Sequence, residues 1–241
     1  NKYSRSYNLT GTLTHMLSSS TFYNIKGSYF FKDFNEYLYD DPYDSKYLHP
    51  DSLIRPDSYS FRTKGTNLHR FYRETNTFFG KVDFNSQVSS EHLLKIGADL
   101  KTNTLNFDDY TLEPLRENGI EVVPFKPSIP DTTQTNRYKY ENSPFEASLY
   151  AQDKIEIENV IINIGLRLDY FDSQGQVPVD VTDPNIYAPL RPGLDSLTYE
   201  ERLPYFYKDA TEKVYLSPRF GIAYPVSATG VVHFSYGHFH E

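Results

Sequence analysis

Apolar and polar residues alternate over many stretches of the chain, and residues 160–170 carry the clearest example, VIINIGLRLDY. Every even-numbered position in this stretch is apolar, whereas the odd-numbered positions include Asn163, Arg167 and Asp169. A period of two places successive side chains on opposite faces of a β-strand. The pattern therefore predicts a strand with one apolar face and one polar face, and the two faces need different surroundings.

The same alternation recurs in pairs of stretches joined by short polar turns, such as Ser18-Ser19-Ser20, and these pairs predict four β-hairpins. Pro218 interrupts one of the stretches, and because proline has no backbone N–H we expect a β-bulge or a strand start there. The predicted strands are residues 4–17, 21–34, 71–88, 94–100, 145–154, 160–170, 214–224 and 231–239.

Three long polar segments separate the hairpins, at about residues 35–70, 105–143 and 172–212. They are rich in Pro and Asp and hold no sustained period, although Asn118-Gly119 indicates an internal turn. Compact soluble domains rarely carry structureless loops beyond about 15 residues, whereas outer-membrane barrels join strands by short periplasmic turns and long extracellular loops. The sequence thus predicts an all-β fold, an antiparallel up-and-down transmembrane β-barrel segment of about eight strands.

The composition agrees with this prediction. Aromatic residues make up 16% of the chain, with 22 Tyr and 17 Phe but no Trp, while the hydrophobic fraction is only 38%. No apolar run approaches the roughly 20 residues of a membrane-spanning helix, but a barrel strand needs only about 10. The net charge of -8 argues against a nucleic-acid partner, and the absence of Cys excludes disulfides and thiolate metal sites.

Two passages carry a family resemblance. Residues 216–240, LSPRFGIAYPVSATGVVHFSYGHFH, resemble a barrel passage of TonB-dependent outer-membrane receptors, particularly of the Bacteroidetes-like group in which a carboxypeptidase-regulatory-like domain and a plug precede the barrel. Residues 14–30 are similar to a barrel hairpin of that group. In this family Ser217-Pro218-Arg219 opens a barrel strand, which would account for the proline.

The resemblance implies a function for the whole receptor. We find no TonB box and no plug domain, and eight strands are fewer than the about 22 of such barrels. Residues 1–241 are therefore expected to be part of one outer-membrane β-barrel domain, an internal fragment of a receptor for active uptake of a siderophore, an oligosaccharide or a peptide. The implied partners are outer-membrane lipid, the plug domain and TonB through the parent chain, and a surface lipoprotein; no enzyme activity and no cofactor are implied.

Two other readings of the pattern stay open. A complete eight-stranded outer-membrane barrel with a structural or adhesive role would also have an even number of strands. A soluble β-sandwich binding module would need a second sheet over the apolar face of residues 160–170.

Two sets of side chains are candidates for the functional site of the barrel, one facing the lumen and one in the long loops. Charged residues on the polar faces of the predicted strands should face a water-filled lumen, and tyrosines in the long loops suit ligand binding because their rings are rigid and amphipathic. The lumen-facing candidates are Lys26, Lys81, Asp83, Lys95, Asp99, Lys101, Arg167, Asp169 and Arg219. The loop candidates are Tyr37, Tyr39, Tyr43, Tyr47, Tyr187, Tyr199, Tyr205 and Tyr207.

Metal and catalytic sites have weaker support. His233, His238 and His240 lie close together, but Glu241 is the one acidic residue with suitable spacing, so rim or loop histidines are favoured. The acidic residues 40–44 and 108–109 lack the spacing of an EF-hand loop. No hydrolase or phosphate-loop motif occurs.

Overall fold

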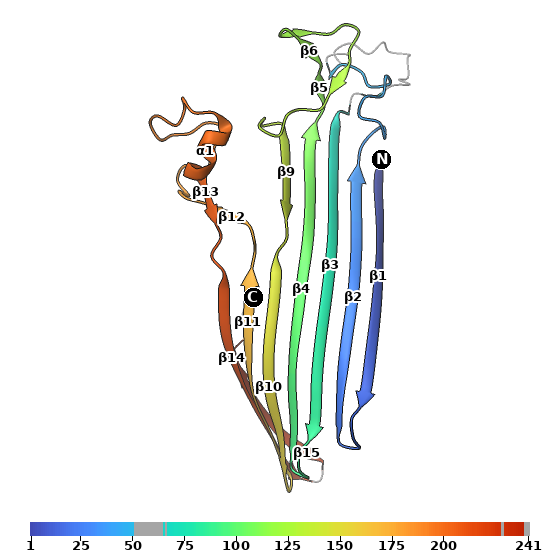
Figure 1. Ribbon diagram of the computed structural model, residues 1–241, viewed down its shortest axis with the longest axis vertical. Helices are drawn as coiled ribbons and strands as arrows, with labels where there is room; N and C mark the ends of the chain where they lie inside the picture. The colour runs from blue at the N-terminus through green and yellow to red at the C-terminus, as the bar shows by residue number, and fades with distance from the viewer. Residues whose placement is uncertain (51–64, 66, 228, 239–241) are drawn as a thin grey trace.

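The computed structural model describes residues 1–50, 65, 67–227 and 229–238 of the 241-residue chain. Its main element is an antiparallel sheet in which eight long strands follow the order β1-β2-β3-β4-β10-β11-β14-β15 (Figure 1). Their bounds are Lys2–Met16 (β1), Thr21–Glu36 (β2), His69–Gln87 (β3), His92–Thr111 (β4), Phe145–Ile157 (β10), Val160–Asp172 (β11), Lys213–Ser227 (β14) and Gly230–Gly237 (β15). The all-β, up-and-down fold and its four hairpins are confirmed; Phe239, the predicted end of the last strand, lies outside the described residues.

Short turns join the strands at one end of the sheet and long segments join them at the other (Figure 1). Three of the turns are residues 17–20, 88–91 and 158–159, and the last of these places Glu158 at a positive φ of 50°. The predicted asymmetry of connection lengths is therefore confirmed.

The register of the strands sorts the side chains into two faces. Directly paired residues lie on the same face of a sheet, so each row across the strands is either apolar or polar. One apolar row is Leu13, Ile25, Val82, Ala98, Leu149, Leu168 and Leu216, and a polar row beside it is Thr12, Lys26, Lys81, Asp99, Ser148, Asp169 and Tyr215. We call these the outer and the inner face.

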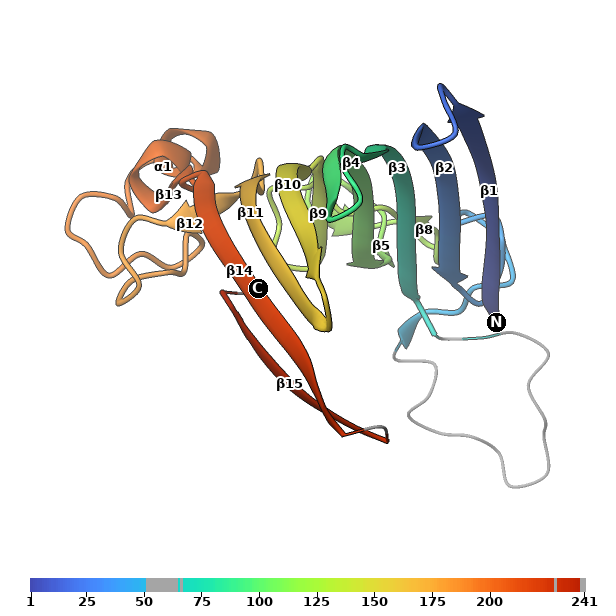
Figure 2. The same ribbon diagram turned by 90° about the horizontal axis from the view of Figure 1, so that it is seen from below.

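The outer face is not covered by protein. Many of its large apolar side chains are exposed, for example Leu168 at 42%, Leu149 at 59% and Leu216 at 60%. Seen along the strands, the main sheet is one curved layer (Figure 2), and the other sheets in the described residues are two-stranded and lie in the long connections. A β-sandwich, which needs a second sheet over the apolar face, is therefore not what this chain forms.

The edges of the sheet bear on the alternative of a complete eight-stranded barrel. β1 pairs with β2 alone and β15 pairs with β14 alone over the described residues. A complete eight-stranded barrel would pair β1 with β15, so this sheet is not a closed barrel by itself.

The second long segment holds more structure than the sequence predicted. β4 continues to Thr111, and β9 (Arg137–Asn142) pairs with it. Further out lie the short strands β5 (Glu113–Pro114), β6 (Arg116–Glu117), β7 (Ile120–Glu121) and β8 (Pro127–Ser128), with Asn118 and Gly119 forming the predicted turn at φ values of 52° and 80°. The prediction of a loop from residue 105 was wrong because aromatic residues occupy both faces of this extension, so the alternation fades.

The third long segment contains helix α1 (Tyr199–Phe206) and the paired strands β12 (Gln176–Pro178) and β13 (Tyr207–Asp209). The Thr198 hydroxyl accepts a hydrogen bond from the Glu201 N–H, and the Glu201 carboxylate accepts one from the Thr198 N–H, which is a capping box. No helix among the described residues is long and apolar enough to cross a membrane.

Pro218 causes neither a bulge nor a strand start. It lies inside β14 in regular register with Leu166 of β11. In the described residues, the pairing of β14 with β15 shifts register between Pro225 and Ser227, away from Pro218. The carbonyl of Pro218 accepts from the His238 N–H, so the missing N–H of the proline also points to the β15 side. Gly237 is the last residue of β15 in the described part of the chain, so the missing N–H falls at the end of the described ladder and not in its interior.

Candidate functional site

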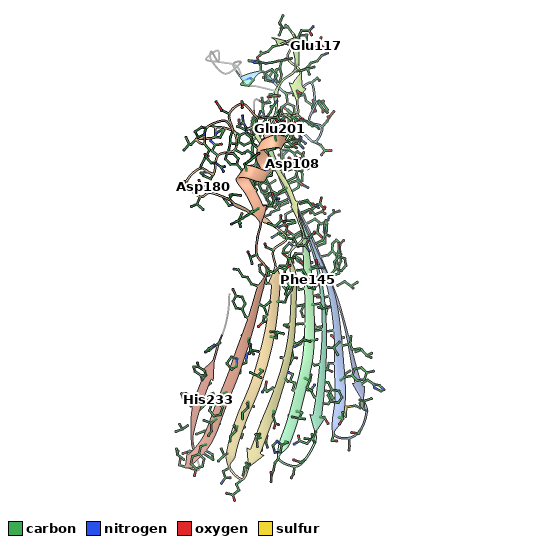
Figure 3. The ribbon with its side chains drawn as sticks, turned by 60° about the vertical axis from the view of Figure 1, so that its left-hand side comes forward. Asp108, Glu117, Phe145, Asp180, Glu201 and His233 are labelled. Carbon is green, nitrogen blue, oxygen red and sulfur yellow. The ribbon has the colours of Figure 1, made fainter. Side chains whose placement is uncertain are left out.

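The nine charged residues predicted for the lumen all lie on the inner face. They lie on β2, β3, β4, β11 and β14, and the paired rows place them together across β10, although they are far apart in sequence. Figure 3 shows the long connections, with Asp180 and Glu201 among them, beyond one end of the sheet, whereas His233 lies within it. The predicted set therefore forms one charged surface on the wall of the sheet.

Arg167 organises one half of this surface. Its Nε donates to the Asp169 carboxylate at 2.7 Å, and its Nη1 lies 3.4 Å from the Asp99 carboxylate two strands away. Asp99, Ser148 and Asp169 occupy one row, so the guanidinium spans the strand that carries Ser148. Ser148 is only 5% exposed, which is consistent with an arginine side chain lying across it.

Tyr150 organises the other half. Its ring lies over Gly97, where a Cβ atom would collide with it, so the glycine is needed for this close approach. The Tyr150 hydroxyl donates to the Asp83 carboxylate, which also pairs with the Lys81 Nζ at 3.2 Å. Three cations surround the ring, with Lys81 at 5.5 Å, Lys95 at 6.0 Å and Arg167 at 5.9 Å from its centroid. No sequence pattern predicts Tyr150 as the centre of this cluster.

Cations outnumber carboxylates on this part of the wall. Lys101 pairs with Glu146 at 2.9 Å, whereas Lys26 stands directly opposite Lys81 and has no ion pair among the described residues. Like charges that face each other across strands are unfavourable. The wall therefore presents positive charge toward whatever occupies the inner side.

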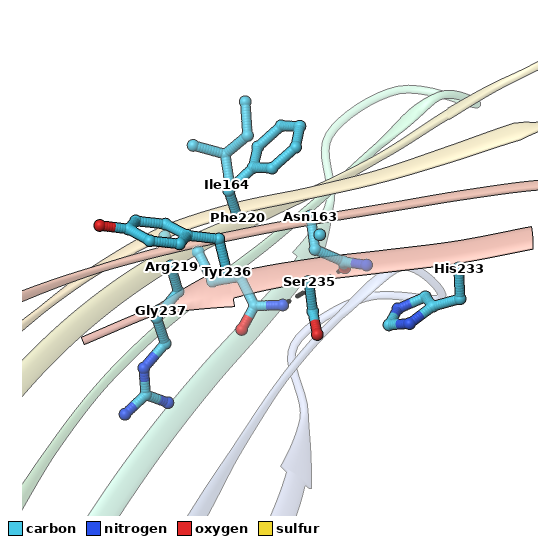
Figure 4. A pocket seen from close by; sticks show the side chains of 11 residues that line it. Asn163, Ile164, Arg219, Phe220, His233, Ser235, Tyr236 and Gly237 are labelled. Atoms are coloured by element: carbon cyan, nitrogen blue, oxygen red, sulfur yellow. Dashed lines mark hydrogen bonds between the residues drawn. The ribbon is translucent and has the colours of Figure 1, made fainter. Parts of the chain in front are cut away.

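A hollow in the inner face lies across β11, β14 and β15. Figure 4 shows Ile164 and Phe220 pointing to one side of the strands, and Arg219, Ser235 and His233 pointing to the other. The hollow is lined by polar groups, including Gln152 and Asn163, beside residues without side chains such as Gly165, Gly221 and Gly237. It gives the wall space for polar contacts or water.

No metal site emerges from the described residues, which contain no group of three or more His, Asp or Glu suited to hold an ion. The Nε2 of His238 lies 2.6 Å from the Tyr236 hydroxyl, and His240 and Glu241 lie outside the described residues. In the acidic segments, Asp108 is bound by the Arg137 guanidinium through two hydrogen bonds of 2.9 and 2.7 Å, and Asp41 and Asp44 accept from backbone N–H groups of their own turns.

Tyrosines of the first long segment surround a buried arginine instead of lining an open surface. Arg70 is 1% exposed and donates to the carbonyls of Tyr39 and Asp40, both at 2.6 Å, and to the hydroxyls of Tyr47 and Tyr72. Tyr47 is itself 2% exposed, in a small core with Leu68, Tyr110 and Leu112. Burial raises the pKa of Tyr110 to about 12.

The cluster around Arg70 holds the first long segment against the end of β3. Tyr37 stacks beneath the Arg70 guanidinium at 4.8 Å, and burial raises its pKa to about 12. Tyr43, in contrast, is 60% exposed. Of the four tyrosines predicted here, Tyr43 is the one that offers an open ring to a ligand.

The third segment holds the other predicted tyrosines. Tyr187 stacks on Tyr199 at 5.5 Å, and burial raises the pKa of Tyr199 to about 12. Tyr187 and Tyr205 are 38% and 52% exposed, whereas Tyr207 is half-buried.

Sequence reasoning missed a group of aromatic residues on the inner face, between the charged rows and the long connections. Phe107 on β4 contacts Tyr138 and Tyr140 on β9, with ring centroids 5.7 and 5.1 Å apart. The spacing of Tyr138 and Tyr140 is the period of a strand, and it was the available signal for both β9 and these rings.

The family model described as "TonB dependent receptor-like, beta-barrel" matches residues 1–239. A search of curated proteins found no match.

Proposed function

This chain belongs to the TonB-dependent receptor β-barrel family, whose model covers nearly its whole length, and from that premise we propose that it is a wall segment of a receptor for active nutrient uptake. The nutrient classes we propose are a siderophore, an oligosaccharide or a peptide. The family places the chain in the bacterial outer membrane, in receptor-type transport and not in enzyme catalysis. It also implies a plug domain and TonB as partners through the parent protein.

One observation carries the proposal: the sheet has an exposed apolar face and, opposite it, a charged face. Leu149 and Leu216 on the outer face are more than half exposed, which suits contact with lipid. On the inner face Arg167, Asp99 and Asp169 form a charged network that needs water or protein beside it. Alternation of lipid-facing and water-facing residues is the pattern of outer-membrane barrels.

The open edges support a larger barrel. In hydrocarbon, unpaired backbone N–H and C=O groups cost several kcal/mol each, so barrels span membranes only when their edges are paired. β1 and β15 leave such edges in the described sheet. We propose that further strands pair with both of them, and that residues 1–241 form one part of one barrel domain.

The positive wall suits a plug that fills the barrel. Lys26 has no ion pair among the described residues and faces Lys81, so a carboxylate on the inner side would relieve their repulsion. We propose that the plug supplies such groups and that a surface lipoprotein covers the long connections. Ion pairs of this kind are each worth about 0–1 kcal/mol when exposed, so a plug can shift without a large loss.

Thiol labelling tests which face meets water. The chain contains no Cys, so single substitutions give clean sites if the rest of the receptor is also free of Cys. Arg219→Cys (inner face) should react with a water-soluble maleimide in intact outer membranes, whereas Leu216→Cys (outer face, same strand) should react only after denaturation. Equal labelling of both variants in membranes would overturn the assignment of faces.

Nutrient depletion tests the transport. Cells with and without the receptor are given a mixture of ferric siderophores, neutral oligosaccharides and short peptides, and depletion is followed by mass spectrometry. We expect receptor-dependent loss of one class, abolished by a protonophore. Receptor-dependent depletion that persists after the proton-motive force is collapsed would indicate a passive pore instead.

A further inference from the structure

An aromatic surface continues from the wall of the sheet into the third long segment. On the wall, Phe107 and Tyr140 are stacked with an interplanar angle of 12°, and Tyr138 lies 5.6 Å from Tyr140. Tyr138 is 64% exposed and Tyr140 is 39% exposed. Tyr138 and Tyr140 are far more exposed than Tyr47 at 2% and Tyr110 at 6% in the cluster around Arg70, so packing alone does not account for them.

The third long segment places its own tyrosine rings beside β9. The Tyr187 hydroxyl donates to the carbonyl of Gln134, which precedes β9, at 3.5 Å. Burial raises the pKa of Tyr207, and the hydroxyls of Tyr187 and Tyr138 raise it further, so Tyr207 lies near both. Two segments that are about 50 residues apart in sequence thus meet at one aromatic surface, which we call the aromatic mouth. Its members are Phe107, Tyr138, Tyr140, Tyr187, Tyr199 and Tyr207.

We propose that the aromatic mouth binds a neutral oligosaccharide. This proposal rests on the proposed function and selects one of its three substrate classes. A pyranose ring exposes a face of C–H groups, and the negative face of an aromatic ring attracts them. Five of the six rings are tyrosines, whose hydroxyls can also exchange hydrogen bonds with sugar hydroxyls. Rigid tyrosines lose little conformational entropy on binding, so they suit a ligand that offers flat faces and no charge.

The charge around the mouth disfavours the other two classes. Residues 173–212 contain seven Asp and Glu against three Arg and Lys. A ferric siderophore with anionic ligand groups would approach against this negative charge. The charged partners that a peptide would need for its termini are partly used inside the protein, since Arg137 binds Asp108 and Arg191 binds Asp183. A neutral ligand meets neither obstacle.

Binding measurements on the purified receptor test the proposal. The probes are neutral oligosaccharides of glucose, mannose, xylose and galactose, with short peptides and a ferric siderophore as comparison ligands. We expect wild type to bind at least one oligosaccharide, and Tyr138→Ala combined with Tyr140→Ala to weaken binding at least tenfold. Tyr138→Phe with Tyr140→Phe keeps the rings and should retain most of the affinity. Tyr224→Ala removes an exposed ring from the outer face of β14 and should bind like wild type.

The outcomes separate this proposal from the transport function. Binding of peptides or the siderophore but of no oligosaccharide would overturn the sugar assignment and leave the uptake function intact. Equal losses in the Tyr224→Ala and the double-Ala variants would also overturn it, because the effect would not be local. Sugar binding without protonophore-sensitive uptake would support the aromatic mouth as a binding site but would refute the proposed active uptake. Migration of the folded receptor on unheated gels confirms that each variant is folded before binding is measured.

Discussion

Replacing Ile25 by Arg tests the contact between the outer face and lipid. Ile25 lies on β2 between Leu13 and Val82 and is 43% exposed. At about 3.4 Å per residue, it lies roughly 7 Å along the strand from Tyr23 and roughly 14 Å from Tyr29. Those two aromatic residues occupy the same face. Ile25 therefore lies inside the band of apolar side chains on the outer face, which we call the apolar band, and not at its border.

The expected cost follows from that depth. Arg on the lipid face of a barrel costs about 2–4 kcal/mol at the bilayer midplane and about 0–1 kcal/mol near the interfaces. Ile25 is nearer to the Tyr23 side, where an arginine can reach toward the headgroups, so we expect a loss of about 2 kcal/mol. In water, the same exposed substitution would change stability by only about 0.5 kcal/mol.

Urea titration of the receptor in lipid vesicles, followed by circular dichroism, measures the difference. Ser28→Arg is the matched control, because Ser28 lies three residues further along β2 on the inner face. It should cost less than about 1 kcal/mol. If both variants lose the same stability, or if Ile25→Arg loses less than Ser28→Arg, the outer face does not meet lipid.

Three further outcomes follow from particular contacts. Gly97→Leu should displace the Tyr150 ring and cost about 1–3 kcal/mol by overpacking, measured as a shift of the unfolding midpoint. Arg70→Met should leave two carbonyls without donors and cost about 3 kcal/mol, seen as faster proteolysis of residues 37–48 while the strands stay protected. The backbone N–H of Leu190, with the Arg191 guanidinium, lowers the pKa of Asp183; the third segment should therefore keep its stability at pH 5 and lose it as the pH falls below the ordinary carboxyl pKa of about 4, measured by amide exchange.

The strands within the apolar band could be predicted from the sequence because lipid and water impose opposite demands on neighbouring residues. Residues 160–170 show this clearly, and the strand occupies Val160–Asp172. The inner-face charges followed from the same rule, since any residue two positions from Arg167 must share its face. The rule fixes a face but carries no information on which strands are neighbours at a given row.

Contacts between distant strands therefore had no signal. Arg167 and Asp99 are 68 residues apart, and their pairing depends on the register of three strands. The alternation pattern places Gly97 at an ordinary position on the polar face, and only the structure shows the Tyr150 ring above it. Pro218 was misjudged for a related reason, since its cost depends on where β15 ends.

The failure of the alternation at residue 105 has the same cause as the aromatic mouth. Beyond the apolar band, water and the long connections reach both faces of the sheet, so neither face is forced to be apolar. On the outer face Tyr110 is then free to pair with Arg70 and stack on Tyr72, and on the inner face Phe107 is free to contact Tyr138. A strand that keeps its hydrogen bonds but no longer alternates apolar and polar residues is thus one that has left the part of the wall where lipid requires an apolar face. In a barrel of this kind, that change marks the part of the wall that can contact a ligand.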